Sequence, residues 1–170
     1  SNLEVPTYAE RCALDAGGFL WDQRKHAREV AYNDFDSRMI ADSAILLGRA
    51  ARAASGGRKL IGTYYGYVMT LNASGHDQWR GHFATKHLLD SGTFDFLMSP
   101  QEYSFLLRGV GTTVGDMKPF ASMQAHGVVS VIEDDTRTHN APWVGCSPGL
   151  DEEMSVSILR RNMGVSLCRN

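Results

Sequence analysis

The stretch from Val128 to His139, "VVSVIEDDTRTH", runs from a strand-like segment directly into a cluster of charges. Residues 128–133 are rich in β-branched side chains, which favour a buried strand. Glu133 closes this segment and Asp134 and Asp135 follow it, yet unpaired charges are too costly to bury in a core. We therefore expect the strand to end at an exposed edge, where parallel α/β sheets place their functional residues.

Two other segments upstream have the composition of strands, and each follows a helical pattern. Residues 59–68 ("KLIGTYYGYV") and 94–99 ("FDFLMS") are rich in aromatic and β-branched residues. One helix is expected from an N-cap at Asn33 to about Ala54, and a second one after a cap at Ser74. The side chains expected on the buried faces of these helices are Phe35, Met39, Ile40, Leu47, Trp79, Phe83, His87 and Leu88.

Two further helices and a lead-in segment complete the pattern. The sequence "SPQE" at residues 99–102 has the form of a capping box for a helix that ends near Gly109. Residues 1–32 show no clear periodicity and are expected to be irregular. The alternation of helices and strands predicts one α/β unit over residues 1–170, with three parallel strands. A final helix is expected over about 151–168, with Met154, Ile158, Val165 and Cys168 inward.

Composition and charge exclude several classes of partner. The 170-residue chain has 17 basic and 19 acidic residues, a formal net charge of -2 and no long block of one sign. Neither nucleic acid nor a membrane is therefore expected as a partner. The three cysteines lie far apart and predict neither a disulfide framework nor a zinc site. We expect a soluble chain without metal or cofactor. A cytoplasmic location is favoured over export by means of a signal peptide that was later removed.

The segments "GTYYGYV", "FDFLMSPQEY", "PFASMQAHG", "VIEDDTRTH" and "ILRRNMG" follow one another in this order along the chain. Together they resemble the catalytic barrel of β-galactosidase-like glycoside hydrolases related to family 42. The resemblance implies part of a (β/α)8 TIM barrel, in which the three strands correspond to the fifth, sixth and seventh. It also implies cleavage of O-glycosidic bonds with retention, with Glu133 at the end of the seventh strand as the nucleophile.

Glu133 is thus the expected catalytic residue, and other side chains are expected to bind a carbohydrate around it. A retaining glycosidase holds two carboxyl groups about 5 Å apart, which requires a rigid support such as a strand end. Asp135 and Arg137 are expected among the substrate-binding residues, and Arg137 is also expected to offset the repulsion of Asp134 and Asp135 and to keep Glu133 ionised. His126 is expected either to touch the substrate or to be bonded within a turn. Tyr64 is expected to pack under a helix. The aromatic walls of the sugar site are expected from Tyr65, Tyr67, Tyr103 and Trp143.

The length of the chain predicts an incomplete barrel. A complete one takes about 250 residues, and the acid/base glutamate of such enzymes would precede Ser1, so the isolated chain is expected to lack it. A sheet of three strands would leave two open edges and an uncovered face, which predicts self-association or a partner chain. Two functions stay open: a glycoside hydrolase, or the nucleophile-bearing part of one, and a non-catalytic barrel remnant that binds carbohydrate or assembles with a partner.

Overall fold

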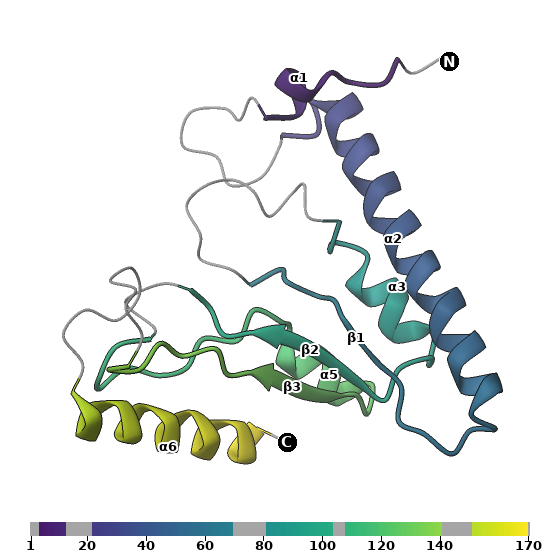
Figure 1. Ribbon diagram of the computed structural model, residues 1–170. Coiled ribbons are helices and arrows are strands. Elements are labelled where there is room, and N and C mark those ends of the chain that lie inside the picture. Colours follow the sequence, from purple (N-terminus) through teal and green to yellow (C-terminus); the bar gives the residue numbers. More distant parts are fainter. Residues whose placement is uncertain (1–3, 13–21, 70–80, 104–107, 141–150, 170) are drawn as a thin grey trace.

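The computed structural model describes residues 4–12, 22–69, 81–103, 108–140 and 151–169. The long helix α2, with α3 beside it, forms one side of the molecule, and α6 lies at the far side, next to β3 (Figure 1). The elements in chain order are α1 (Tyr8–Cys12), α2 (Ala27–Ala54), β1 (Gly62–Tyr64), α3 (Thr85–Asp90), β2 (Phe96–Pro100), α5 (Phe120–Ala125), β3 (Val129–Glu133) and α6 (Glu152–Arg169).

The three strands form one parallel sheet in the order β1-β2-β3. Tyr64 of β1 lies beside Met98 of β2, which in turn lies beside Val131 of β3. The register ends with Pro100 opposite Glu133. The prediction of a mixed α/β fold with three parallel strands and flanking helices is confirmed, although β1 covers only three of the residues expected for it.

The hydrophobic core lies on one face of this sheet. Leu97 and Ser99 of β2 point to this face, because side chains alternate along a strand, and both are fully buried. α2 and α3 pack on each other above this face, and α5 packs against β3. The buried apolar side chains of this core are Ala41, Ile45, Tyr65, Ala84, Leu88, Leu89, Phe94, Leu97, Met123 and Val128.

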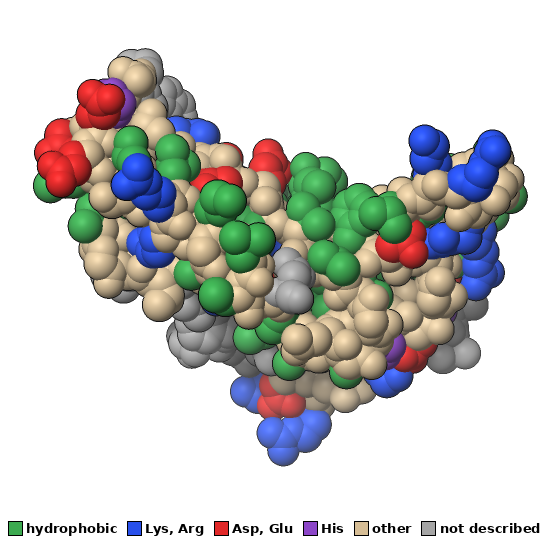
Figure 2. All heavy atoms as spheres, turned by 90° about the horizontal axis from the view of Figure 1, so that it is seen from below, with side chains coloured by type: hydrophobic (Ala, Val, Ile, Leu, Met, Phe, Trp, Pro, Cys, Tyr) green, Lys and Arg blue, Asp and Glu red, His purple; other side chains and the backbone are tan. Residues whose placement is uncertain are grey.

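The other face of the sheet has little cover among the described residues. Tyr64, Met98 and Val131 share this face because they are neighbours in register. Tyr64 and Val129 are each about half exposed, at 52% and 47%. Figure 2, which views the molecule from below, shows hydrophobic side chains gathered near the middle of the surface. Parallel sheets ordinarily bury both faces, so this face has the character of a surface that another layer covers.

The helix predicted from Asn33 begins earlier and buries a different face from the expected one. α2 starts at Ala27, and its expected inward residues Phe35, Met39 and Leu47 are exposed. The reason is the closeness of the helix to the segment that leads into β2: a Cβ on Gly48 would lie only 2.8 Å from the Phe94 ring. Small side chains therefore occupy the contact. The buried positions of α2 are Glu29, Asn33, Ser37, Ala41, Ile45 and Gly48.

The first 32 residues and the second predicted helix also differ from expectation. α1 and the first turns of α2 lie within the segment that was expected to be irregular. The second helix, α3, begins only at Thr85, so Phe83 precedes it and is exposed. Ser74 and Trp79, the expected cap and one of the expected core residues, lie outside the described residues.

The capping-box prediction was wrong, because Ser99 and Pro100 are the last residues of β2 and Gln101 then bridges to Asp116. The expected helix falls in part on residues 104–107, outside the described part of the chain. α5 was not expected. α6 was, but its buried residues are Ser155, Ile158 and Asn162, whereas Met154 and Cys168 are exposed and Val165 is only partly buried.

Tyr65 supports the core through its hydroxyl group, which suggests a test of stability. The hydroxyl donates to the carbonyl oxygens of Gly81 (2.7 Å) and Ser37 (3.1 Å), and burial raises the pKa of this phenol to about 12. An unfolded tyrosine titrates near pH 10, so the folded state retains a proton that the unfolded state loses. The stability that Tyr65 contributes is therefore present below pH 10 and is lost as the pH rises toward 12.

We expect the substitution Tyr65→Phe to lower the free energy of unfolding by about 1–3 kcal/mol at neutral pH, because it leaves the buried Gly81 carbonyl without the donor that the hydroxyl supplies. It should also flatten the fall in stability between about pH 10 and 12. Urea unfolding across this pH range measures both effects, with Tyr8→Phe, at an exposed residue of α1, as the matched control. A neutral-pH effect of Tyr65→Phe no larger than that of the control would contradict the assignment.

Candidate functional site

Glu133 closes β3 at the carboxyl edge of the sheet, where the strand meets solvent. Tyr64 closes β1 at the same edge. Alternation along β3 puts Glu133 on the same face as Val131, and the register puts Tyr64 on that face as well. The Glu133 side chain is exposed. A carboxylate and a phenol from two different strands therefore meet on the open face of the sheet.

The two carboxylates that follow Glu133 are held in place by neighbouring groups. Asp134 accepts hydrogen bonds from the Asn162 side-chain amide of α6, at 3.2 and 3.1 Å, and from the backbone N–H of Thr136. Asp135 accepts one bond from Arg108 at 2.7 Å and one from the Tyr103 hydroxyl at 2.8 Å. Both aspartates thus fix the loop after β3, and Glu133 is the one of the three whose side chain is directed to the open face.

Arg108 is the cation that holds this edge together, and sequence reasoning missed it. Its guanidinium group is buried and donates to the backbone carbonyls of Gln101 (2.9 Å) and Glu102 (2.8 Å) as well as to Asp135. It also lies 4.2 Å from the centre of the Tyr103 ring. Arg137, the cation expected beside Glu133, is exposed and donates to the backbone carbonyl of Asp135 instead.

Three phenols lie close enough to Glu133 for its charge to affect them. Burial raises the pKa of Tyr64, and Glu133 raises it further through its charge and by accepting a hydrogen bond. Burial raises the pKa of Tyr67 to about 12, with further contributions from Tyr64 and Glu133. Burial also raises the pKa of Tyr103, followed by its bond to Asp135. All three phenols are neutral hydrogen-bond donors at neutral pH.

The structure brings some of the expected sugar-binding residues together and separates others. Tyr67 and Tyr103 lie near Glu133, and Tyr67 stacks on the His82 ring at 4.5 Å. Tyr65 lies in the core, so it cannot form a wall of the site, and Tyr64 takes the place expected for it. The prediction that Tyr64 packs under a helix was therefore wrong, because Tyr65 is the buried residue of the two. Trp143 lies outside the described residues.

His126 lies away from this edge of the sheet. It follows α5 and precedes β3, so it belongs to the end of the sheet opposite Glu133. Its ring contacts the carbonyl of Ser122 (2.7 Å) and the carboxylate of Asp90 (3.1 Å), and these two groups raise its pKa. Of the two roles expected for His126, the structure favours that of a histidine bonded within a turn.

α6 positions the loop that carries the acidic cluster. Arg161 donates to the carbonyls of Gly109 (2.7 Å) and Thr112 (2.8 Å), and its guanidinium also bonds the side chain of Asn162. Asn162 in turn bonds Asp134 and Thr136. Arg161 and Asn162 of the "RRN" triplet are therefore connected in one network with Asp134 and Thr136 of the "EDDT" block.

The chemistry available on the open face of this edge is that of one exposed carboxylate, Glu133, beside a phenol, because Asp134 and Asp135 are engaged by Asn162 and Arg108. Within the described ranges, no group of three or more His, Cys, Asp and Glu side chains is arranged to hold a metal ion. No helix in the described part of the chain is long and apolar enough to cross a membrane. Phenols offer both an apolar ring and a hydroxyl, a combination that suits neutral ligands rich in hydroxyl groups.

Comparison with known proteins adds no relative: no family model, curated protein or solved structure matches this chain. The functional assignment therefore depends on the residues at the carboxyl edge of the sheet and on their geometry.

Proposed function

We propose that the carboxyl edge of the sheet is a carbohydrate site and that Glu133 is the nucleophile of a retaining, β-galactosidase-like glycoside hydrolase. The observation that carries this proposal is the difference among the three carboxylates. Asp134 and Asp135 are each held by hydrogen bonds from neighbouring side chains, and Glu133 points to the open face beside a phenol. A nucleophilic carboxylate must be both rigidly placed and accessible to the anomeric carbon.

The support around Glu133 fits this role. It is the last residue of a strand, and the two residues after it are fixed by Arg108 and Asn162. Tyr64 lies on the same face of the sheet, close enough for the Glu133 charge to raise its pKa. Small errors in the placement of reacting atoms cost large factors in rate, so this degree of support is what a nucleophile requires.

We further propose that the sheet is part of a (β/α)8 barrel, with β1, β2 and β3 in the places of the fifth, sixth and seventh strands. The uncovered face would then be the inside of the barrel, and Glu133 would lie at its carboxyl mouth, where such enzymes carry their active sites. Further strands, from the same protein or from a partner chain, would cover the open edges of β1 and β3 and supply the acid.

The second candidate is a non-catalytic module that binds carbohydrate or assembles with a partner. It is favoured by the state of the other carboxylates, because a retaining mechanism needs a protonated acid about 5 Å from the nucleophile. Asp134 and Asp135 are hydrogen-bonded to Asn162 and Arg108 and come from the same strand end as Glu133. Neither is therefore placed to protonate a leaving group on the side of the sugar opposite to Glu133.

A binding measurement tests the site that both candidates share. We expect methyl β-galactoside to bind the chain weakly, with a Kd of about 1 mM, and Tyr64→Ala to raise this Kd at least tenfold. Tyr8→Ala, which removes an exposed phenol from α1, is the matched control and should change nothing. Isothermal titration calorimetry that detects no galactoside binding, or equal effects of the two substitutions, would contradict a sugar site at this edge.

A turnover measurement then separates the two candidates. For the 170-residue chain alone we expect little or no hydrolysis of phenyl β-galactoside, whose leaving group requires protonation, because neither Asp134 nor Asp135 is placed to act as the acid. Hydrolysis that appears when the chain is joined to the rest of a barrel supports the hydrolase. Robust hydrolysis by the chain alone would show that the acid lies within it and would overturn this part of the account.

A further inference from the structure

The outward side of α2 carries apolar side chains that nothing else in the described structure covers. Figure 1 shows α2 along one side of the molecule, with α3 and the sheet on its inner side. Phe35, Met39 and Leu46 are 63%, 48% and 69% exposed. Their spacing of four and seven residues puts them on one face of the helix, and we call these three residues the α2 stripe.

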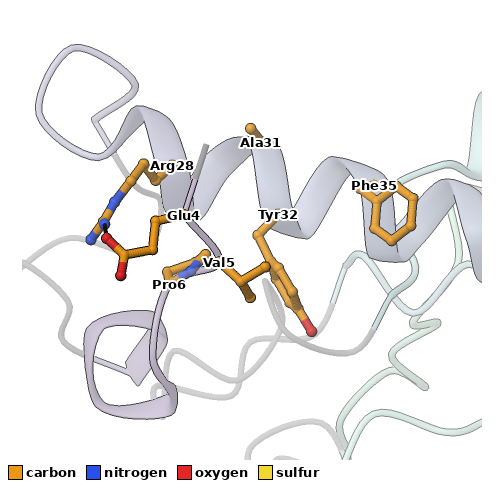
Figure 3. Close-up of a pocket in the computed structure, with 7 residues that line it drawn as sticks. All are labelled: Glu4, Val5, Pro6, Arg28, Ala31, Tyr32 and Phe35. Carbon is orange, nitrogen blue, oxygen red and sulfur yellow. Dashed lines mark ion pairs between the residues drawn. The ribbon is translucent and has the colours of Figure 1, made fainter. Parts of the chain in front are cut away.

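The α2 stripe continues into a pocket at the N-terminal half of the helix. The pocket, of about 190 Å³, lies between the segment at residues 4–6 and α2 (Figure 3). The stripe and this pocket together form an apolar surface along several turns of a helix about 42 Å long, at about 1.5 Å per residue. The residues that line the pocket are Glu4, Val5, Pro6, Arg28, Ala31, Tyr32 and Phe35.

Charged side chains beside the α2 stripe indicate what covers it. Asp34, Arg38, Asp42 and Arg49 are all exposed and lie along one flank of the stripe, because they are separated by four, four and seven residues. Within one copy, Asp34 pairs with Arg38 at 3.0 Å and Asp42 pairs with His87 of α3 at 2.7 Å. Their signs alternate along the helix. A second copy of the same helix in the antiparallel direction therefore presents the opposite sign at each place, because the two-fold axis keeps this flank of both helices on the same side of the interface.

We propose that two copies of this chain associate through α2, with the two helices antiparallel about a two-fold axis near Ala41. Helical spacing then places Phe35 against Leu46 of the second copy, and Leu46 against its Phe35. On the flank, Arg38 lies near Asp42 of the second copy, and Asp34 lies near its Arg49. A two-fold interface requires such a self-complementary surface, and this inference does not depend on the proposed function.

The apolar part of the interface is tested by Leu46→Glu, measured by sedimentation equilibrium of the full chain. We expect the unaltered chain to have twice the mass of a single copy, and Leu46→Glu to raise the dissociation constant at least a hundredfold. Leu167→Glu on α6 is the matched control, because Leu167 is also 69% exposed, and it should leave the mass unchanged. Val129→Glu on the open sheet face should also leave it unchanged. Circular dichroism checks that all variants remain folded.

The antiparallel direction is tested by exchanging two charges. Asp34→Arg and Arg49→Asp should each weaken the dimer at least tenfold, and the double variant should restore it, because the charges then attract again in exchanged positions. A chain that stays a single copy at high concentration would overturn the proposal. A dimer that dissociates in Val129→Glu but not in Leu46→Glu would also overturn it. The same holds if the loss of dimer affinity in the double variant equals the sum of the losses in the two single variants.

Discussion

Replacing Glu133 with glutamine is expected to remove nearly all turnover from an enzyme that contains this chain, by roughly a thousandfold or more. Glutamine has almost the same shape as glutamate but cannot attack the anomeric carbon. Glu133 is an exposed end-of-strand residue, so folding and galactoside binding should change little. The measurement is kcat for an aryl β-galactoside together with the Kd for methyl β-galactoside.

Two further variants make this result specific to the nucleophile. Glu153→Gln removes an exposed carboxylate from the first turn of α6 and should leave kcat unchanged. Glu133→Ala should regain part of the lost rate when azide is added, because a small anion can then occupy the vacated space and attack in place of the carboxylate. Full activity of Glu133→Gln would exclude Glu133 as the nucleophile.

Replacing Lys118 with methionine is expected to have the largest effect on stability, a loss of about 3–5 kcal/mol. The Lys118 ammonium group is fully buried and lies 3.0 Å from Asp116. It donates to the Ser99 hydroxyl of β2 at 2.6 Å and to the Val131 carbonyl of β3 at 3.1 Å. The substitution leaves a buried carboxylate without its cation, and domains of this size are stable by only about 5–15 kcal/mol.

The direction of the Lys118 pKa gives this prediction a pH dependence. Burial lowers the pKa of Lys118, and Asp116 opposes that shift. The unfolded chain therefore holds more protons than the folded one between the lowered pKa and the ordinary value of about 10.5. The contribution of Lys118 to stability rises with pH in that interval. This pH dependence is opposite in sign to that of the Tyr65 contribution, which falls between about pH 10 and 12.

Urea unfolding measures the effect of Lys118→Met, with Lys86→Met as the control. Lys86 is 82% exposed and pairs with Asp90 on the surface, so its removal should cost less than about 1 kcal/mol. Adding Asp116→Asn to Lys118→Met should recover part of the loss, because the unpaired charge is removed as well. A cost of Lys118→Met below about 1 kcal/mol would show that the buried pair is not needed.

The strands β2 and β3 were predictable because each is a short run of apolar, β-branched and aromatic residues that is followed by polar residues. The place of Glu133 followed from the same pattern. Tyr64 and Tyr65 show the limit of this reasoning: adjacent residues of a strand face opposite sides, and assigning the wrong one inward exchanges the core residue and the site residue. The composition of "GTYYGYV" does not distinguish the two.

The supporting residues were not predictable, because their contacts join distant parts of the chain. Arg108 reaches Asp135 across 27 positions, and Arg161 reaches Gly109 across 52. The inward face of α2 was missed for a different reason. The helix lies so close to the core and to the segment before β2 that small residues, Ala41 and Gly48, occupy the contact, and this leaves larger side chains such as Phe35 on the outside.

Covalent labelling with a 2,4-dinitrophenyl 2-deoxy-2-fluoro-β-galactoside tests the central claim most directly. Dinitrophenolate leaves without protonation, so the first chemical step needs no acid glutamate, and the fluorine slows the release of the sugar from the nucleophile. Mass spectrometry of peptides then locates the bound sugar. The account predicts a fluorosugar ester on Glu133 and none in Glu133→Gln. A sugar attached to Asp134 or Asp135, or a protein that binds the compound and gains no covalent sugar, would contradict it.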